Sequence, residues 1–450
     1  MSRSEQMSSG SIPKLLLKYS LPAITGMLVN ALYNIVDSIF VGQGVGELAL
    51  AGTTVSFPII IILMAFVMLV AMGATALISI RLGENKEKEA EKIIGNSLTL
   101  FFIVGITLTI LGLIFIEPLL KMFGASENIL PYSLDYMRII LLGSLFMAVG
   151  IGMNNFIRAE GNPKMAMYTM LIGAVTNVVL DYVFIFIFTW GIKGAAWATV
   201  ISHGVSSTWV LYYFLSGKSS LKIRKKYFKP EFTIVTQIAA VGFPACALQL
   251  TSSVQHLILN RSLAHYGGDM ALAAIGIVMS VASLLIMPAI GISQGAQPII
   301  GFNYGAKNFH RVKDTLKLAV LAATSIVTFG FIMIRLGAPQ LVKLFNDNPE
   351  LIELGTHAMK IFFMFLPLIG MQIIGSNFFQ ATGRPRRATL LSLSRQVLIF
   401  IPLVLILPRF YGLDGIWRAA PAADLGAFLL TGSFLFYEIR NLNKQQANKI

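Results

Sequence analysis

Charged side chains are scarce in this chain of 450 residues: Asp, Glu, Lys and Arg together make up 12% of it. A water-soluble domain carries roughly 25% charged residues, so the composition excludes a chain built for water alone. Cysteine is almost absent, with Cys246 alone, which excludes a disulfide framework and a cysteine metal site. The five histidines do not show the spacing of metal ligands.

Motifs for catalysis and nucleotide binding are missing as well. The sequence contains no Walker phosphate-binding loop, no nucleophile elbow and no zinc-binding helix. We therefore expect that the protein is not an enzyme, needs no cofactor and is not driven directly by ATP. The first apolar stretch has no small-residue cleavage site and is longer than a signal-peptide core, so we expect a retained membrane span.

Apolar residues dominate what is present. They make up 56% of the chain, and the mean hydropathy is +0.74. Runs of about 20 apolar residues are typical of membrane helices, and the sequence predicts twelve. The expected spans are 15–41, 49–80, 93–117, 131–157, 165–188, 192–216, 236–264, 271–303, 311–336, 351–380, 386–410 and 413–438.

The first half of the chain is repeated in the second half. Residues 22–163 match a later stretch without a gap at a fixed offset of 222 positions, and the glycines and prolines stay in register. The matched pairs include Pro22 with Pro244, Gly73 with Gly295, Gly83 with Gly305, Gly161 with Gly383, and Pro163 with Pro385. Because each copy has six spans, both copies enter the membrane from the same side. We therefore predict an all-α membrane protein of two six-helix lobes, related by a parallel internal repeat typical of transporters.

The positive charge follows the predicted loops. With the N-terminus inside, 26 of the 35 Lys and Arg residues fall on the cytoplasmic side. This bias predicts that both termini are cytoplasmic, and it argues against nucleic-acid binding despite the net charge of +14. The densest basic cluster, 218–229, joins the two copies, and we interpret it as a linker that sets the membrane topology and is also attracted to anionic lipid headgroups. The predicted domains are an N-lobe at 1–216, this linker at 217–235 and a C-lobe at 236–450.

Two aspartates in the first copy point to an ion site. A carboxylate at the bilayer centre costs roughly 2.5–3.5 kcal/mol even on a lenient scale, so Asp37 and Asp181 need a reason to be there. Asn177 lies four residues before Asp181 and shares its helical face. The turn at 190–194 returns Thr199 to about the same depth. These oxygens predict a site that binds Na⁺ or holds a shared proton.

The second copy lacks these groups. Leu259, Ile399 and Leu403 occupy the positions that match Asp37, Asn177 and Asp181. A purely architectural pair should occur in both copies, because both copies share one architecture. The difference therefore predicts an ion site in the first lobe alone.

Two further residues lie inside predicted spans and leave alternatives open. Asp424 is not on the same helical face as Arg418, so we assume no pair between them; it is a candidate second protonation or substrate site, or a structural hydrogen-bonding group. Pro22 removes a backbone hydrogen bond and can bend its helix. That bend is either static or coupled to protonation of Asp37.

Several segments together resemble the multidrug and toxic compound extrusion (MATE) family. These are Pro22, the Asp37–Gly42 segment, the Ala49–Ala51 run, Gly73 and Gly83, and the Arg158–Pro163 segment. The resemblance covers essentially the whole chain, and within the family it is similar to bacterial MepA-like exporters. It implies a secondary active exporter that exchanges a cation, H⁺ or Na⁺, for amphipathic and often cationic compounds by alternating access.

The resemblance also implies residues. The family's first-lobe ion site matches Asp37, Asn177, Asp181 and Thr199, and these are the possible Na⁺ ligands. The substrate-binding candidates are Asn30, Asn34, Asn154, Met170, Gln249 and Asp424. Another branch of the family has carboxylates in its seventh and tenth spans; this chain has Gln249 and His256 in the seventh and no mid-span acid in the tenth.

The alternative functions are a lipid-linked oligosaccharide or lipid flippase of the same superfamily and a membrane-embedded enzyme. The flippase is disfavoured because most basic residues map to cytoplasmic loops rather than to a cavity, and the enzyme because no catalytic constellation is present. We expect a multi-pass protein of the cell membrane whose partners are small molecules and membrane lipids. Because the chain contains both lobes, we expect a monomer.

Overall fold

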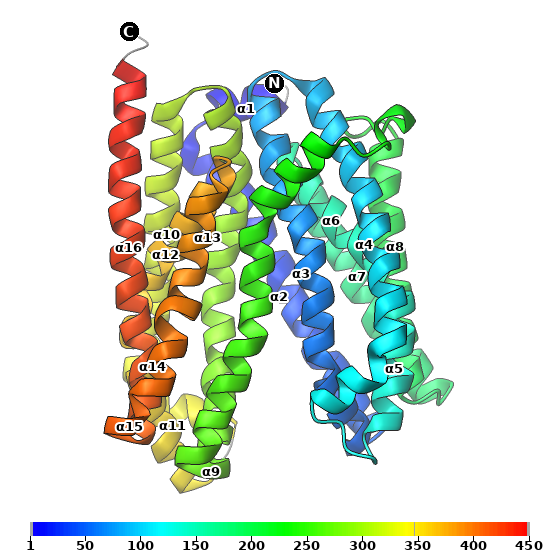
Figure 1. Cartoon of the computed structure of the whole chain (residues 1–450), viewed down its shortest axis with the longest axis vertical. Helices are drawn as coiled ribbons and strands as arrows, with labels where there is room; N and C mark the ends of the chain where they lie inside the picture. The colour runs from blue at the N-terminus through cyan, green and yellow to red at the C-terminus, as the bar shows by residue number, and fades with distance from the viewer. Residues whose placement is uncertain (1–2, 346, 448–450) are drawn as a thin grey trace. The chain divides into compact units, whose positions relative to one another are not determined.

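The computed structural model describes residues 3–345 and 347–447, and in these residues it contains helices and no strands. Figure 1 shows long helices joined by short connections. The helices of the first half are α1 (Arg3–Ser9), α2 (Ile12–Gly44), α3 (Glu47–Gly83), α4 (Glu87–Met122), α5 (Leu130–Leu142), α6 (Ser144–Ala159), α7 (Pro163–Tyr182), the π-helix η1 (Val183–Ile187), α8 (Ile192–Leu215) and the 3₁₀ turn η2 (Lys225–Tyr227). Those of the second half are α9 (Phe232–Gly305), α10 (Phe309–Lys343), α11 (Pro349–Phe362), α12 (Leu366–Ala381), α13 (Pro385–Leu393), the π-helix η3 (Ser394–Phe400), α14 (Ile401–Ile406), α15 (Pro408–Tyr411) and α16 (Leu413–Ala447).

The expected membrane architecture is confirmed, with local differences. Within the described residues, nine helices are long and apolar enough to cross a membrane, and two bent pairs bring the number to eleven. The pairs are α5 with α6, bent by 55°, and α11 with α12, bent by 51°. They correspond to the predicted spans 131–157 and 351–380, each of which we expected to be one continuous helix. The remaining predicted span, 192–216, is the helix α8, whose serines, tyrosines and His203 lower its mean hydropathy.

The internal repeat extends to the backbone. Gly161 and Gly383, which match in the sequence, both have a positive φ, at 96° and 69°. Asn85 and Lys307 stand at the same offset, and both are left-handed, at 59° and 57°. A left-handed φ is uncommon for a residue other than glycine, so its recurrence at equivalent positions supports the duplication. The two bent helix pairs and the two π-helices also recur in matching spans.

The chain forms two compact units that exchange two helix segments. Unit 1 contains 1–9 and 25–249, and unit 2 contains 10–24 and 250–450. The first part of α2 therefore belongs to unit 2, and the first part of α9 belongs to unit 1. A non-helical glycine, Gly268, at φ 60°, separates the two spans that make up α9. The lobe boundaries expected from the sequence, 1–216, 217–235 and 236–450, stay a prediction about domains.

Each unit packs its own helices around apolar side chains. In unit 1, α3 contacts α4, α5 and α6, and α8 contacts α5, α6 and α7. In unit 2, α12 contacts both α10 and α16. The core of unit 2 includes Trp417 and Phe379, which are both fully buried.

Small residues allow the exchanged segments to approach their units closely. In unit 1, a Cβ on Gly73 would lie 2.9 Å from the backbone nitrogen of Gly242 and would also clash with the carbonyl oxygen of Ile238. In unit 2, the matching Gly295 lies against Ser20, and an added Cβ would lie 2.7 Å from the Ser20 backbone nitrogen. Both crossings therefore bring helix backbones together at a position that tolerates no side chain.

We expect Gly73→Ala to destabilise the protein by about 1–3 kcal/mol, because the new methyl group meets rigid backbone atoms. The matched control is Gly276→Ala, where an added Cβ has no neighbour within 4 Å; there alanine should be neutral or stabilise the helix by up to about 1 kcal/mol. The measurement is the thermal unfolding midpoint of each purified variant in one detergent. Equal midpoints for the two variants would contradict the close α3–α9 contact.

Candidate functional site

The centre of the predicted ion site lies on α7. Asn177 and Asp181 are four residues apart, so the helix places both side chains on one face. Asn177 is 1% exposed and Asp181 is 0% exposed. The π-helix η1 begins two residues after Asp181, and π-turns of this kind are frequent at functional sites. Asn177 and Asp181 therefore form a buried polar face on an otherwise apolar helix.

Helix α2 contributes the second carboxylate. The side chains of Asp37 and Asp181 lie within hydrogen-bonding range of each other. A carboxylate only accepts hydrogen bonds, so a bond between the two groups requires that one of them carries a proton. With both groups ionised, Oδ1 of Asp37 and both carboxylate oxygens of Asp181 are buried and have no donor.

Helix α8 completes the group. The side-chain amide of Asn177 donates to the hydroxyl of Thr199 at 3.4 Å. That hydroxyl in turn donates to the carbonyl oxygen of Ala195 at 3.1 Å, so its oxygen keeps accepting capacity. Oδ1 of Asn177 is buried and has no donor. The structure thus brings together all four residues that the sequence selected for the ion site.

The arrangement is suited to a cation. Four buried acceptor atoms, one from Asp37, one from Asn177 and two from Asp181, have no donor. An unsatisfied buried polar group is costly, and a proton or a hard cation such as Na⁺ would satisfy these oxygens. Within the described ranges there is no cluster of three or more His, Cys, Asp or Glu side chains that could hold a metal. The acceptor atoms are all oxygens, which are the ligands that H⁺ and hard cations such as Na⁺ accept.

Two tyrosines near this group were missed in the sequence. Tyr136 of α5 is 7% exposed, and its side chain lies near Thr199 and within electrostatic range of both carboxyl groups. Tyr33 of α2 lies near Asn30 and Asn34 and within range of the same carboxyl groups. The internal repeat contained the signal, because Ala358 and Gln255 occupy the matching positions in the second copy.

The predicted substrate residues of unit 1 fall into two environments. Asn30 and Asn34 are exposed on α2, where the amide of Asn34 donates to the Asn30 carbonyl at 2.8 Å and to its side-chain oxygen at 3.2 Å. Asn154 of α6 is 5% exposed, and its side-chain oxygen is buried and has no donor. Met170 of α7 is half-buried, and a Cβ added to Gly26 would lie 2.6 Å from its sulfur.

The remaining predicted residues lie at the ends of the exchanged segments or in unit 2. Pro22 is inside the continuous helix α2, three residues before the chain passes from unit 2 to unit 1. Gln249 is half-buried and is the last residue of unit 1. Each position therefore lies near a boundary between the units, which falls inside the first helix of each copy, α2 or α9.

Asp424 has a partner that the sequence did not indicate. Nε of Arg395 donates to Oδ1 of Asp424 at 2.5 Å, and the Asp424 side chain is 1% exposed. Arg395 lies in the π-helix η3, and its neighbour Gln396 donates to the hydroxyl of Ser252 at 3.5 Å. The second copy therefore holds an ion pair whose carboxylate is buried, and Arg395 lies one helical turn before Ile399, the position that matches Asn177.

Comparison with known proteins agrees with these features. The MatE family model matches residues 22–183 and again residues 244–406, and the starts of the two matches differ by the offset of the internal repeat. The multidrug export protein MepA of Staphylococcus haemolyticus is 29% identical over 432 residues, covering 96% of this chain and 94% of that protein. MepA of Staphylococcus aureus is 27% identical over 429 residues, covering 95% of this chain and 94% of that protein.

Solved structures agree over nearly the full length. The MATE multidrug transporter DinF-BH is 39% identical, with a TM-score of 0.91, covering 98% of this chain and 99% of that chain. An outward-facing multidrug resistance MATE family transporter of the MOP superfamily is 27% identical, with a TM-score of 0.92, covering 99% of each chain. These relatives are transporters rather than enzymes, and they do not favour the flippase alternative. The chain belongs to the MATE family of multidrug efflux transporters, and within it resembles the MepA exporters.

Proposed function

We propose that the protein exports drugs in exchange for an inward-moving cation that binds at Asp37 and Asp181. The observation that carries this proposal is the group of buried oxygens without donors around these two side chains. They occur in the first copy, and the second copy has leucine at both matching positions. The ion is transported cargo here, so its site must bind it and also release it.

The coupling follows from electrostatics. Two buried carboxylates in contact repel each other when both are ionised, and a proton or Na⁺ between them removes that repulsion. A bound cation and a cationic drug then favour different states of the first lobe. By binding linkage, the drug must weaken ion binding by the same factor by which the ion weakens drug binding.

We favour H⁺ as the coupling ion, because two carboxyl groups in hydrogen-bonding range can share a proton. Na⁺ is the alternative, since the oxygens of Asn177 and Thr199 are ligands that a hard cation accepts. The sequence contains no nucleotide-binding motif, so an inward ion gradient supplies the energy in either case.

The proposed substrates are amphipathic and often cationic compounds. MepA is named a multidrug export protein and DinF-BH a multidrug transporter, and these names support the export of small-molecule drugs. In this chain, Asn30, Asn34, Asn154 and Met170 form the proposed first-lobe binding wall, and Gln249 is a further candidate. Asp424 is a further candidate too, although its contact with Arg395 favours a structural or charge-balancing role.

Transport is proposed to occur by alternating access of the two lobes, with bending at Pro22 as part of the change. We place the protein in the plasma membrane as a monomer with both termini in the cytoplasm, in agreement with the distribution of Lys and Arg. Membrane lipids surround it, and no nucleic acid is involved.

We expect Asp37→Asn and Asp181→Asn each to reduce gradient-driven export to background, at least about tenfold, because an amide cannot exchange a proton or balance a cation. The assay is dye export from proteoliposomes in which pH and Na⁺ gradients are imposed separately. The matched control is Asp135→Asn, which removes a partly exposed carboxylate 3.2 Å from Lys193 and should have little effect. Wild-type export by a folded Asp37 or Asp181 variant would refute the site.

The substrate wall makes a second prediction. Asparagine in a membrane span is favourable only when it faces protein or water, so the double substitution Asn30→Ala and Asn154→Ala should weaken drug binding by several-fold to tenfold, about the effect of one or two hydrogen bonds. Binding of several dyes to purified protein is the measurement, with Asn443→Ala, an exposed site, as the control. Unchanged affinity for every dye would show that Asn30 and Asn154 do not line the drug-binding chamber.

A further inference from the structure

The linker between α8 and α9 is fastened to unit 1 by side chains that form part of its core. Glu91 of α4, 6% exposed, accepts from the backbone nitrogen of Lys222 at 3.2 Å and from Nε of Arg224 at 2.6 Å. This hydrogen bond raises the pKa of Arg224 above its ordinary value, so the guanidinium stays charged. The start of the basic segment is therefore fixed in place.

The end of the linker is held by a second buried residue of α4. The amide of Asn96, 0% exposed, donates to the carbonyl oxygen of Tyr227 at 3.2 Å, and its oxygen accepts from the backbone nitrogen of Glu231 at 2.6 Å. The Thr99 hydroxyl donates to the carbonyl oxygen of Phe228 at 2.7 Å. Side chains of one helix thus satisfy the linker backbone at several points.

A third buried group holds the segment just after α8. The carboxylate of Glu160, 2% exposed, accepts from the hydroxyl of Ser219 at 2.5 Å and from the backbone nitrogen of Ser220 at 3.2 Å. The hydroxyl of Tyr213 also donates to it. Glu91, Asn96 and Glu160 together form what we call the linker clamp.

The clamp exists in one copy of the repeat. Lys313, Leu318 and Thr382 occupy the positions that match Glu91, Asn96 and Glu160. The three residues therefore serve the linker itself rather than the shared architecture of the lobes.

The clamped linker presents a basic surface. Lys222, Lys225, Lys226 and Lys229 are all exposed. The acidic groups nearby are engaged by other cations: Glu91 by Arg224, and Glu231 by Lys92 at 3.4 Å. In the part of the chain that the structure describes, no ion pair joins any of these four lysines to an acid. Their charge is therefore available to an anionic partner.

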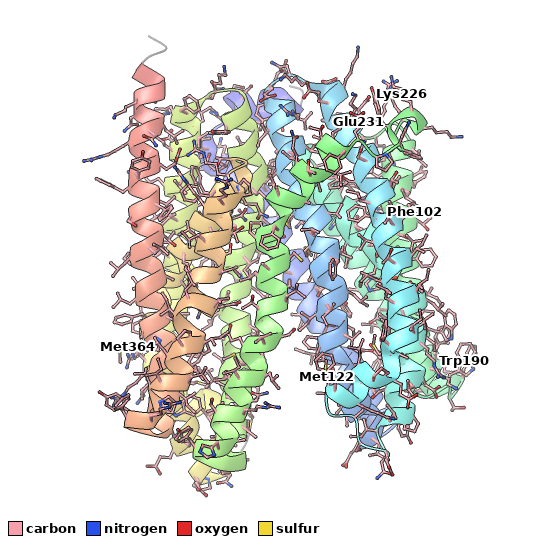
Figure 2. The ribbon with its side chains drawn as sticks, in the orientation of Figure 1. Phe102, Met122, Trp190, Lys226, Glu231 and Met364 are labelled. Atoms are coloured by element: carbon pink, nitrogen blue, oxygen red, sulfur yellow. The ribbon has the colours of Figure 1, made fainter. Side chains whose placement is uncertain are left out.

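Exposed apolar side chains lie before, within and after this stretch of lysines in the sequence. Phe228 and Phe232 are 37% and 83% exposed, and Leu215 is 70% exposed. Lys226 and Glu231 lie at one end of the unit 1 helices, and Trp190 lies at the opposite end (Figure 2). Exposed aromatic and basic side chains at the end of a membrane helix are typical of the membrane–water interface. This mixture does not fit a surface that faces only water.

We infer that the clamped linker is a docking surface for anionic phospholipid headgroups of the cytoplasmic leaflet. Lysines near such a leaflet are attracted to its negative surface potential, and the exposed Phe and Leu side chains insert beside them. Because the clamp fixes the backbone, the linker that carries the lysines loses little freedom on binding. This inference goes beyond the transport activity and does not depend on the ion site.

The test is native mass spectrometry of the full-length protein in detergent, titrated with phosphatidylglycerol or phosphatidylcholine. The wild-type protein should prefer phosphatidylglycerol. Changing Lys222, Lys225, Lys226 and Lys229 to Gln should weaken phosphatidylglycerol binding about tenfold or more. The control removes the same charge from other exposed lysines predicted to be cytoplasmic, which are Lys14, Lys88, Lys307 and Lys444, and should change it little.

Equal losses for the two quadruple variants, or no preference for phosphatidylglycerol in the wild type, would overturn the inference. Inorganic phosphate added at millimolar concentration should not compete; competition would identify a site for a free anion rather than a lipid. Asn96→Leu, which copies Leu318 of the second repeat, tests the clamp without changing charge. It should weaken phosphatidylglycerol binding several-fold, and unchanged binding would show that the clamp does not matter.

Discussion

The central constraint on this structure is the cost of placing two carboxylates together inside a membrane protein. Asp37 and Asp181 lie within hydrogen-bonding range, and most of their oxygens are buried without donors. Neither group has a Lys or Arg partner within the described residues. The pair therefore needs an exchangeable cation, since no fixed one is supplied. In an exporter, that need is useful, because the site can take its cation from one side of the membrane and lose it to the other.

In the second lobe, by contrast, the buried carboxylate of Asp424 has a cationic partner. Asp424 is joined to Arg395 at 2.5 Å, and the carboxylate is 1% exposed. A buried pair of this kind is costly to break, because removing either partner leaves an uncompensated charge. One copy of the repeat thus has a carboxylate pair without a cationic partner, whereas the other pairs its buried carboxylate with an arginine. This asymmetry on a shared scaffold is consistent with ion coupling in the first lobe alone.

Much of this could be predicted from the sequence. Apolar runs marked the spans, glycine and proline register revealed the duplication, and the absence of Asp37 and Asp181 from the second copy selected the candidate site. The bends between α5 and α6 and between α11 and α12 could not be predicted, because hydropathy does not report helix direction. Arg395 was missed because its partner lies on another helix, and a single sequence does not reveal contacts between helices. The exchange of helix segments between the units could not be predicted either, because it involves close backbone contacts between helices, at Gly73 and Gly295.

The most direct test of the account is the number of protons released when a cationic dye binds to the purified protein. It is measured by calorimetry in two buffers of different ionisation enthalpy, with and without Na⁺. If the Asp37–Asp181 pair exchanges a proton for the drug, the wild-type protein should release protons on binding, and Asp37→Asn should abolish that release. Release of Na⁺ in place of protons would identify Na⁺ as the coupling ion. Dye binding that releases no proton and does not respond to Na⁺ would contradict ion–drug exchange at this site.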